Sequence, residues 1–258
     1  MNETTFNLSQ FRTNNFSQNG EDGVIEKLFE ILEINSGYLV EFGAWNGVHL
    51  SNTRHHYAKP DNKFKTVLIE SSPDRFSELT ANVPWNDNNI LLNLEVKKEG
   101  ESSLNQIFKK YSVKDIALLS IDTDSGDDLS LFESLDTTAI EGFRPKVVII
   151  EFAKWKSPQA LNKLVSTFEF KGYSLVCVTG NFIFIDDEHA LDLGLVIKSK
   201  DTVHKLIRKS GSPEYMHYFK QISDERYEEL KKQLPGKDIH VSLAGEQIIS
   251  VDKLSDEV

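Results

Sequence analysis

Short apolar runs alternate with amphipathic segments over the first 186 residues of the chain. Runs of five or six apolar residues have the length of ordinary strands, whereas apolar residues that recur every three or four positions are typical of helices. The runs predict strands at residues 38–42, 66–70, 90–94, 116–121 and 146–151. The amphipathic segments predict helices at residues 21–32, 50–58, 73–81, 103–111 and 158–170, with another beginning near residue 128.

Two further apolar runs, residues 174–178 and 182–186, are joined by Thr179-Gly180-Asn181, a sequence suited to a hairpin turn. Strands that are apolar throughout and alternate with helices are typical of a parallel sheet covered on both faces. The pattern therefore predicts an α/β fold with a Rossmann-like, seven-stranded, mostly parallel sheet. An antiparallel hairpin is expected at its edge, and helices on both faces.

The 258 residues suit one large domain or one domain with an extension. We expect residues 1–200 to form the main domain and residues 201–258 to be an extension packed on it. In that extension, residues 201–233 are expected to be helical and residues 238–254 to add a strand. No run approaches the roughly 18–20 apolar residues of a membrane span, and no leader is evident, so we expect a soluble, cytoplasmic protein.

The charge and cysteine content narrow the classes of partner. A formal net charge of -11 argues against nucleic acid, because proteins that bind phosphate backbones usually carry a basic surface. Cys177 is the single cysteine, so no internal disulfide can form, which fits a reducing compartment. Its place in an apolar run favours a core residue over a nucleophile. The oligomeric state is left open, with a homodimer as one alternative.

A glycine turn follows the first strand, in the sequence YLVEFGAWNG at residues 38–47. A dinucleotide site usually carries G-x-G-x-x-G, in a turn that receives a diphosphate. Here the spacing is G-x-x-x-G, and Glu41 precedes Gly43, so a diphosphate would be repelled. A carboxylate at this place suits the amino group or sulfonium of S-adenosylmethionine. The alternative is a plain strand-to-helix turn with a surface acid.

A second acid, Glu70, ends the next apolar run, where its carboxylate could accept both hydroxyls of a ribose. The alternative is an acid at a helix start, since Pro73 suits a first helical turn. Together with the glycine turn, Glu70 predicts a site for S-adenosylmethionine at the carboxyl edge of the sheet. Trp45 could stack on a ligand there or fill the core.

The chain resembles the FkbM-like family of S-adenosylmethionine-dependent methyltransferases over roughly residues 14–186. The resemblance is carried by FSQNGEDG at 16–23, VEFGA at 40–44, LSNT at 50–53, VLIE at 67–70, LLSIDTDSGD at 118–127, PKVVIIE at 145–151 and GY at 172–173. One departure lies after the fourth strand, where Ser125 separates Asp124 from Gly126. The resemblance implies O-methylation of a hydroxyl on a sugar, a cell-surface polysaccharide precursor or a related phosphate-bearing metabolite.

Together, the residue pattern and the resemblance give a set of expected cofactor contacts. They are Gln18, Glu41, Gly43, Ala44, Asn52, Glu70, Ser71 and Asp122. Glu21 and Asp22 would line the pocket by the resemblance, or else simply suit a helix N-terminus.

Four carboxylates crowd into residues 122–128, an arrangement that raises carboxylate pKa values or attracts a cation. Asp122, with Asp124 as a second candidate, could be a general base or could orient the substrate. Asp122, Asp124 and Glu151 could instead bind a divalent ion, although we expect no metal. Asp127 and Asp128 could cap the next helix.

Three histidines follow the glycine turn. His49 and His56 lie seven residues apart and would share a helical face, with His55 beside them. A neutral histidine near the methyl group could take the proton of a substrate hydroxyl, and His49 is the candidate. For each histidine alone, a surface or packing role is the simpler interpretation. Without zinc-spaced cysteines, a structural zinc site is rejected.

Two other function classes stay open. One is a non-catalytic Rossmann-like binding module, and the other is a nicotinamide-dependent oxidoreductase. The acids at positions 41, 70 and 122 count against the first, and the missing G-x-G-x-x-G counts against the second.

Overall fold

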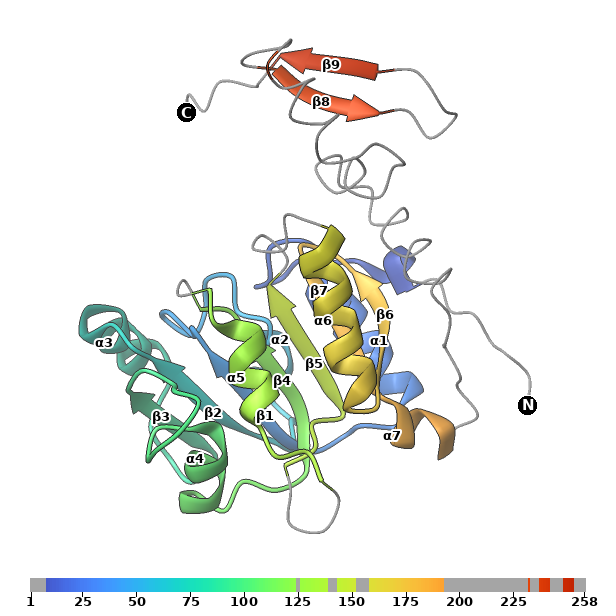
Figure 1. Ribbon diagram of the computed structural model, residues 1–258. Helices are drawn as coiled ribbons and strands as arrows, with labels where there is room; N and C mark the ends of the chain where they lie inside the picture. Colours follow the sequence, from blue (N-terminus) through green and yellow to red (C-terminus); the bar gives the residue numbers. More distant parts are fainter. Residues whose placement is uncertain are drawn as a thin grey trace.

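The computed structural model describes residues 8–123, 126–138, 143–151, 158–192, 232, 237–241 and 248–252 (Figure 1). The strands are β1 Gly37–Phe42, β2 Phe64–Glu70, β3 Asn89–Asn93, β4 Ile116–Ile121, β5 Val147–Glu151, β6 Tyr173–Val178, β7 Asn181–Asp186, β8 Lys237–Val241 and β9 Ile248–Asp252. The helices are α1 Glu21–Ile31, α2 Arg54–Tyr57, α3 Pro73–Asn82, α4 Leu104–Lys110, α5 Asp128–Ser134, α6 Pro158–Phe170 and α7 Asp187–Asp192, preceded by the 3-10 helix η1 Leu8–Phe11.

Seven strands form one sheet in the order β3-β2-β1-β4-β5-β7-β6. Strands β1 to β5 run parallel to one another, whereas β7 is antiparallel to both β5 and β6. The predicted hairpin is therefore present, with β7 inserted between β5 and the edge strand β6. This is the Rossmann-like, seven-stranded, mostly parallel sheet that the alternation of apolar runs and helices predicts.

The alternation of side chains along each strand divides the core into two layers. In β1, Val40 faces the layer that contains α4, α5 and α6, and its neighbour Leu39 faces the layer that contains α1, α3 and α7. Figure 1 shows α4, α5 and α6 on the near face of the sheet and α1, α2 and α3 behind it. Because the strands are buried on both faces, they are continuously apolar in sequence.

The predicted helix over residues 50–58 is wrong in extent. Only α2, Arg54–Tyr57, is helical, and Leu50 has a positive φ of 57°. The buried Glu41 carboxylate accepts hydrogen bonds from residues 51–53 and holds them outside a helix. At α3, Pro73 occupies the first turn as predicted, and the Ser72 hydroxyl caps the helix by accepting from the Arg75 amide.

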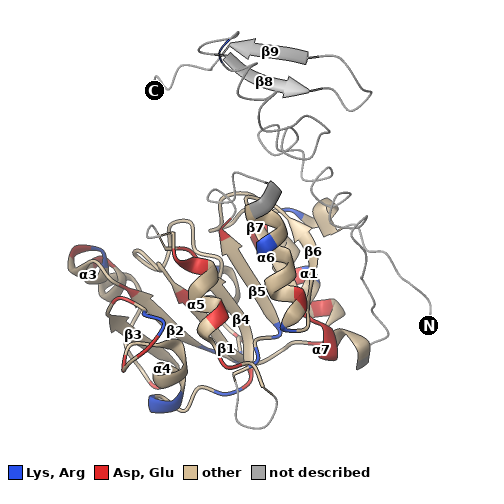
Figure 2. Cartoon of the chain, in the orientation of Figure 1, with Lys and Arg blue, Asp and Glu red and all other residues tan. Residues whose placement is uncertain are grey.

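The C-terminal expectations are tested only in part. The predicted helical segment 201–233 lies outside the described residues except for Lys232. The predicted strand over 238–254 is instead the antiparallel pair β8 and β9. Within the described residues, no helix has both the length and the apolar character needed to cross a membrane. Acidic residues are spread over several elements, including α5 and α7 (Figure 2).

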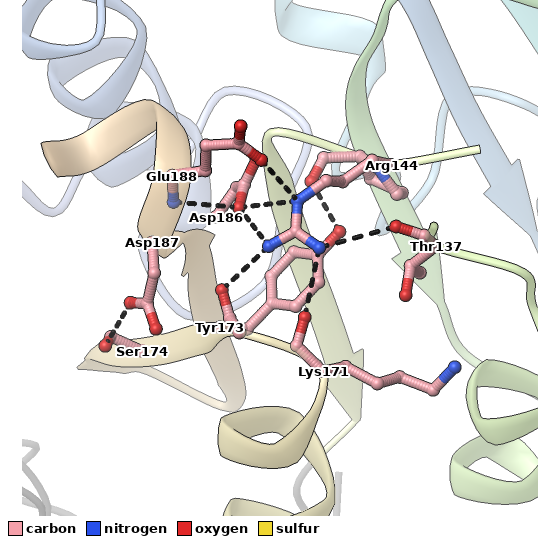
Figure 3. Close-up of polar contacts among 10 residues, drawn as sticks. Thr137, Arg144, Lys171, Tyr173, Ser174, Asp186, Asp187 and Glu188 are labelled. Atoms are coloured by element: carbon pink, nitrogen blue, oxygen red, sulfur yellow. Dashed lines mark hydrogen bonds and ion pairs between the residues drawn. The ribbon is translucent and has the colours of Figure 1, made fainter. Parts of the chain in front are cut away.

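Arg144 hydrogen-bonds several segments at the end of the sheet opposite the carboxyl ends of its parallel strands (Figure 3). Its Nε donates to Asp186 Oδ1 at 2.8 Å, and its guanidinium also donates to the carbonyls of Lys171 and Gly172. The cation lies 5.0 Å from the centroid of the Tyr173 ring. One side chain thus joins the segments before β5 and β6 to the end of β7.

We predict that Arg144→Ala lowers the free energy of unfolding by about 3 kcal/mol, because the buried Asp186 carboxylate loses its cation. Urea denaturation followed by circular dichroism measures the change. Lys163→Ala is the control, since its ion pair with Glu133 spans 3.9 Å on an exposed surface and should contribute less than about 0.5 kcal/mol. Equal losses in the two variants would contradict the assigned role.

Candidate active site

An open cavity of about 350 Å³ lies at the carboxyl edge of the sheet. Among the predicted residues, Glu41, Gly43, Ala44 and His49 line it from β1 and the turn that follows. Gln18, Glu70, Ser71 and Asp122 line it from three other segments. Seven of the eight expected cofactor contacts therefore meet at one cavity, and the exception is Asn52.

Glu41 holds the loop after the glycine turn. Its Oε2 accepts hydrogen bonds from the hydroxyls of Ser51 at 2.7 Å and Thr53 at 2.6 Å. Its Oε1 accepts from the Asn52 amide at 2.8 Å. Burial raises the pKa of Glu41, and these three donors oppose that effect by stabilising the charged form. Because the carboxylate fixes residues 51–53, the chain cannot continue as a helix from residue 50.

The Asn52 side chain helps to hold the loop against the sheet and does not line the cavity. Its side-chain amide donates to Ser120 Oγ on β4 at 3.0 Å, and the residue is buried. The hydrogen bond to Ser120 holds the Asn52 side chain toward the sheet, so of the eight expected cofactor contacts Asn52 is the one that does not line the cavity. Oε1 of Glu41 keeps a lone pair for one more donor, so Glu41 can still bind an ammonium group.

Gly43 is required by the close approach of β1 and β4. Its φ is +80°, and a Cβ at this position would collide with the carbonyl oxygen of Asp122. The amides of Gly43 and Ala44 both donate to the carbonyl of Ile69 on β2, at 3.0 and 3.1 Å. The glycine thus brings the ends of three strands together at the floor of the cavity.

Glu70 connects the first two strand-to-helix loops. Its Oε2 accepts from the Trp45 amide at 2.9 Å, and its Oε1 accepts from the Ser72 amide at 2.8 Å. The residue is 3% exposed and lines the cavity. Each oxygen retains a lone pair, so the carboxylate can accept two further hydrogen bonds from a vicinal diol.

An aromatic and cationic group stands at the rim of the cavity. The Arg75 guanidinium lies 4.8 Å from the centroid of the Trp45 ring, and the ring of exposed His49 meets Trp45 edge-on at 5.1 Å. Trp45 has a positive φ of 46°, so its backbone conformation is unusual for a large side chain. Trp45 is half-buried and lines the cavity, so it is not a core residue, and its stacking on a ligand stays a prediction.

Asp122 is exposed at the end of β4, on the cavity wall. The turn that follows is held by Asp128, whose buried Oδ1 accepts from the Thr123 amide at 3.0 Å and from the Thr123 hydroxyl. Asp127 occupies the N-cap position of α5 but makes no side-chain capping bond. Asp124, the second catalytic candidate, lies outside the described residues.

The three histidines have different places. His56 is buried against Phe29, with ring centroids 4.8 Å apart, and burial lowers the pKa of its imidazole to about 3. His55 lies near Glu26 on the outside of α1. His49 precedes α2 and does not share a helical face with His56, so that expectation is wrong. Of the three, His49 alone lines the cavity.

The sequence prediction missed the wall after β3. Half-buried Leu94 and Val96, with exposed Glu95 between them, line the cavity. The signal was available, because β3 is a parallel strand and its carboxyl end must reach the same edge as those of β1 and β2. Arg75 was also missed, since a charged residue in a first helical turn has many surface roles.

The metal alternative finds no support in the described residues, where no group of three or more His, Cys, Asp or Glu side chains could hold an ion. Of its three proposed ligands, Asp122 and Glu151 line the cavity and Asp124 is not described.

No protein-family model and no curated protein matches the sequence. Among solved structures, an O-methyltransferase from Bacillus cereus in complex with SAH is similar, with 15% identity, a TM-score of 0.46, and coverage of 68% of this chain and 84% of that one. The fibrillarin pre-rRNA processing protein of Methanococcus jannaschii has 14% identity, a TM-score of 0.40, and coverage of 59% and 67%. A TehB-like SAM-dependent methyltransferase from Corynebacterium glutamicum has 13% identity, a TM-score of 0.37, and coverage of 70% and 92%. Likenesses this distant say nothing of what this chain binds.

We predict that Gly43→Ala lowers the free energy of unfolding by about 3 kcal/mol, from the strain of a positive φ and the collision with Asp122. The matched control is Gly100→Ala, where φ is +81° and a Cβ would meet nothing within 4 Å. The control should lose only about 1 kcal/mol, the cost of the backbone conformation. Urea denaturation measures both, and a difference near zero would show that β1 and β4 do not need the close approach.

Proposed function

We propose that the protein is an S-adenosylmethionine-dependent O-methyltransferase that acts on a small polar acceptor. The observation that carries the proposal is the cavity at the carboxyl edge, where Glu41, Glu70 and Asp122 gather around the exposed Gly43. A diphosphate placed against these carboxylates would be repelled, whereas a cationic sulfonium and ammonium would be attracted.

The described residues fit this cofactor from end to end. Glu70 offers two acceptor lone pairs for the ribose hydroxyls, and Glu41 offers one for the ammonium group. Between them, the exposed Gly43 leaves the backbone open to close contact. The half-buried Leu94 and Val96 supply apolar surface for the adenine, on the far side of Glu70.

When bound, S-adenosylmethionine supplies a methyl group that the acceptor oxygen attacks while the sulfur keeps the electron pair of the breaking bond. The protein contributes chiefly by positioning the acceptor in line with that bond. Asp122, held at the cavity wall by the end of β4, receives the proton from the acceptor hydroxyl. His49 is the second candidate for this proton, since it lines the same cavity.

The acceptor class follows from the resemblance to the FkbM-like family. We propose a sugar, a cell-surface polysaccharide precursor or a related phosphate-bearing metabolite, methylated in the cytoplasm. Polar groups on the cavity wall suit an acceptor of this kind.

Calorimetric titration with S-adenosylmethionine, S-adenosylhomocysteine and NAD tests the proposal. We expect micromolar binding of the two adenosyl compounds and no binding of NAD. Glu70→Ala should weaken binding by about 100-fold or more, because two hydrogen bonds to a charged group are lost. Glu70→Gln should lie between, and Glu78→Ala, an exposed acid on α3, should bind as the wild type does.

Other results of the titration would favour one of the two alternative functions. Binding of NAD alone would favour the oxidoreductase, and a folded protein that binds none of the three would favour the non-catalytic module. Thermal unfolding of Glu70→Ala must accompany the titration, since Glu70 also accepts the amides of Trp45 and Ser72.

Asp122→Asn should lower kcat by about 100-fold or more, the usual contribution of a positioned general base. Its affinity for S-adenosylmethionine should stay within about threefold of the wild type. Formation of S-adenosylhomocysteine over a panel of sugars and nucleotide sugars provides the assay. His49→Gln serves as the matched variant: if it loses the activity that Asp122→Asn retains, then His49 and not Asp122 takes the proton.

A further inference from the structure

One polar side chain reaches the cavity from the segment before α1. Residues 14–20, here called the N-terminal loop, place the exposed Gln18 on the cavity wall. The two residues that follow the loop, Glu21 and Asp22, do not line the cavity and are fully buried. A fully buried carboxylate is costly unless it is hydrogen-bonded, so the partners of these two acids show what they do.

Asp22 holds the first half of the N-terminal loop. Its Oδ2 accepts hydrogen bonds from the consecutive amides of Asn15, Phe16 and Ser17, at 2.7, 2.7 and 3.0 Å. The Ser17 hydroxyl in turn accepts from the Asp22 amide at 3.0 Å. Three charge-assisted bonds from neighbouring amides leave this half of the loop a single conformation.

Glu21 holds the second half of the loop against the β6–β7 turn. Its Oε2 accepts from the Asn19 amide at 2.7 Å, and its Oε1 accepts from the Thr179 hydroxyl at 2.6 Å and the Asn181 side chain at 3.1 Å. A Cβ on Gly180 would collide with the Asn19 side chain, so the loop and the turn touch directly. The backbone at Gln18 is therefore held from both sides.

The sheet order places Gln18 on the half of the cavity away from Glu70. Strands β1, β2 and β3 form one half, with Glu70, Leu94 and Val96 at their ends. Strands β5, β7 and β6 form the other half. It contains Glu151 and the β6–β7 turn, to which the N-terminal loop is anchored. Asp122, at the end of β4, stands between the halves. Under the proposed function, the first half takes the adenosine, and the second half is left for the acceptor.

We propose that Gln18 is a specificity-determining residue for a neutral, hydroxyl-bearing acceptor, and that Asp22 and Glu21 are positioning residues that present it. This inference rests on the proposed function, which supplies the division of the cavity. It reassigns Gln18 from the cofactor, where the sequence placed it, to the acceptor.

The chemistry of this half matches a hydroxyl. The Gln18 amide both donates and accepts, as a hydroxyl group does, and the carboxylates of Asp122 and Glu151 accept from hydroxyl donors. An acceptor with a phosphate on this side would bring its charge toward those two carboxylates. The backbone that carries Gln18 is already held by these bonds, so less ordering entropy is lost when a ligand binds than with a free loop.

The test uses ligand-observed saturation-transfer NMR on the full chain loaded with S-adenosylhomocysteine. The probes are the methyl glycosides of glucose, galactose, mannose and xylose, with glucose 6-phosphate as the charged counterpart. We expect at least one glycoside to bind and Gln18→Ala to weaken it about tenfold, as for one or two lost hydrogen bonds. Affinity for S-adenosylhomocysteine, measured by calorimetry, should stay within twofold. Gln10→Ala, an exposed glutamine away from the cavity, should change neither.

The positioning role has its own readout. In Asp22→Asn, hydrogen exchange of the amides of residues 15–17 should accelerate at least tenfold while affinity for S-adenosylhomocysteine is kept. Glycoside affinity should fall, and adding Gln18→Ala should weaken it no further, because Asp22 acts through Gln18.

Each contrary result overturns the inference. Weaker binding of S-adenosylhomocysteine by Gln18→Ala would place the residue on the cofactor, and unchanged glycoside affinity would remove it from the acceptor. Binding of glucose 6-phosphate alone, or of no glycoside at all, would refute the neutral hydroxyl acceptor. Absence of S-adenosylhomocysteine binding by the wild type would instead be the failure of the proposed function.

Discussion

Buried carboxylates that accept hydrogen bonds from loop donors are the constraint on which the cavity depends. Glu21, Asp22, Glu41, Glu70 and Asp128 are all nearly or fully buried, and each binds the backbone amides of a neighbouring loop. A buried carboxylate cannot stay charged without donors, and a loop amide at the end of a sheet cannot stay unpaired. Here the loop amides donate to the buried carboxylates, so the loops around the cavity are held in place before any ligand binds.

The sheet could be predicted from the sequence because its signal is local. Strands such as β4, with every residue buried, are apolar throughout, and the helices between them show their apolar faces at helical spacing. The glycine turn and the acids at the strand ends could be found for the same reason, since parallel strands end at one edge. No single segment of the sequence predicts the order of the strands, in which β7 lies between β5 and β6.

What the sequence could not give is which acid serves the fold and which faces the cavity. Glu21 and Asn181 are far apart in the chain, yet they share a hydrogen bond. The residue pattern and the resemblance placed Asn52 at the cofactor, whereas in the structure its side-chain amide donates to Ser120 on β4. Gly43 was expected to contact the cofactor, and the structure shows that a Cβ at this position would also collide with the Asp122 carbonyl oxygen. Such pairings depend on the folded arrangement and produce no periodic pattern in the sequence.

The division between supporting and exposed acids also limits the chemistry. Glu41 has three of its acceptor positions occupied, so protonating it would break the bonds that hold residues 51–53. A supporting carboxylate therefore makes a poor proton acceptor, even though burial raises its pKa. Asp122 is exposed on the cavity wall, and its backbone lies against Gly43 at the end of β4. The buried acids thus hold the loops beneath the cavity, whereas the exposed Asp122 lies on its surface, where the proposed function needs a proton acceptor.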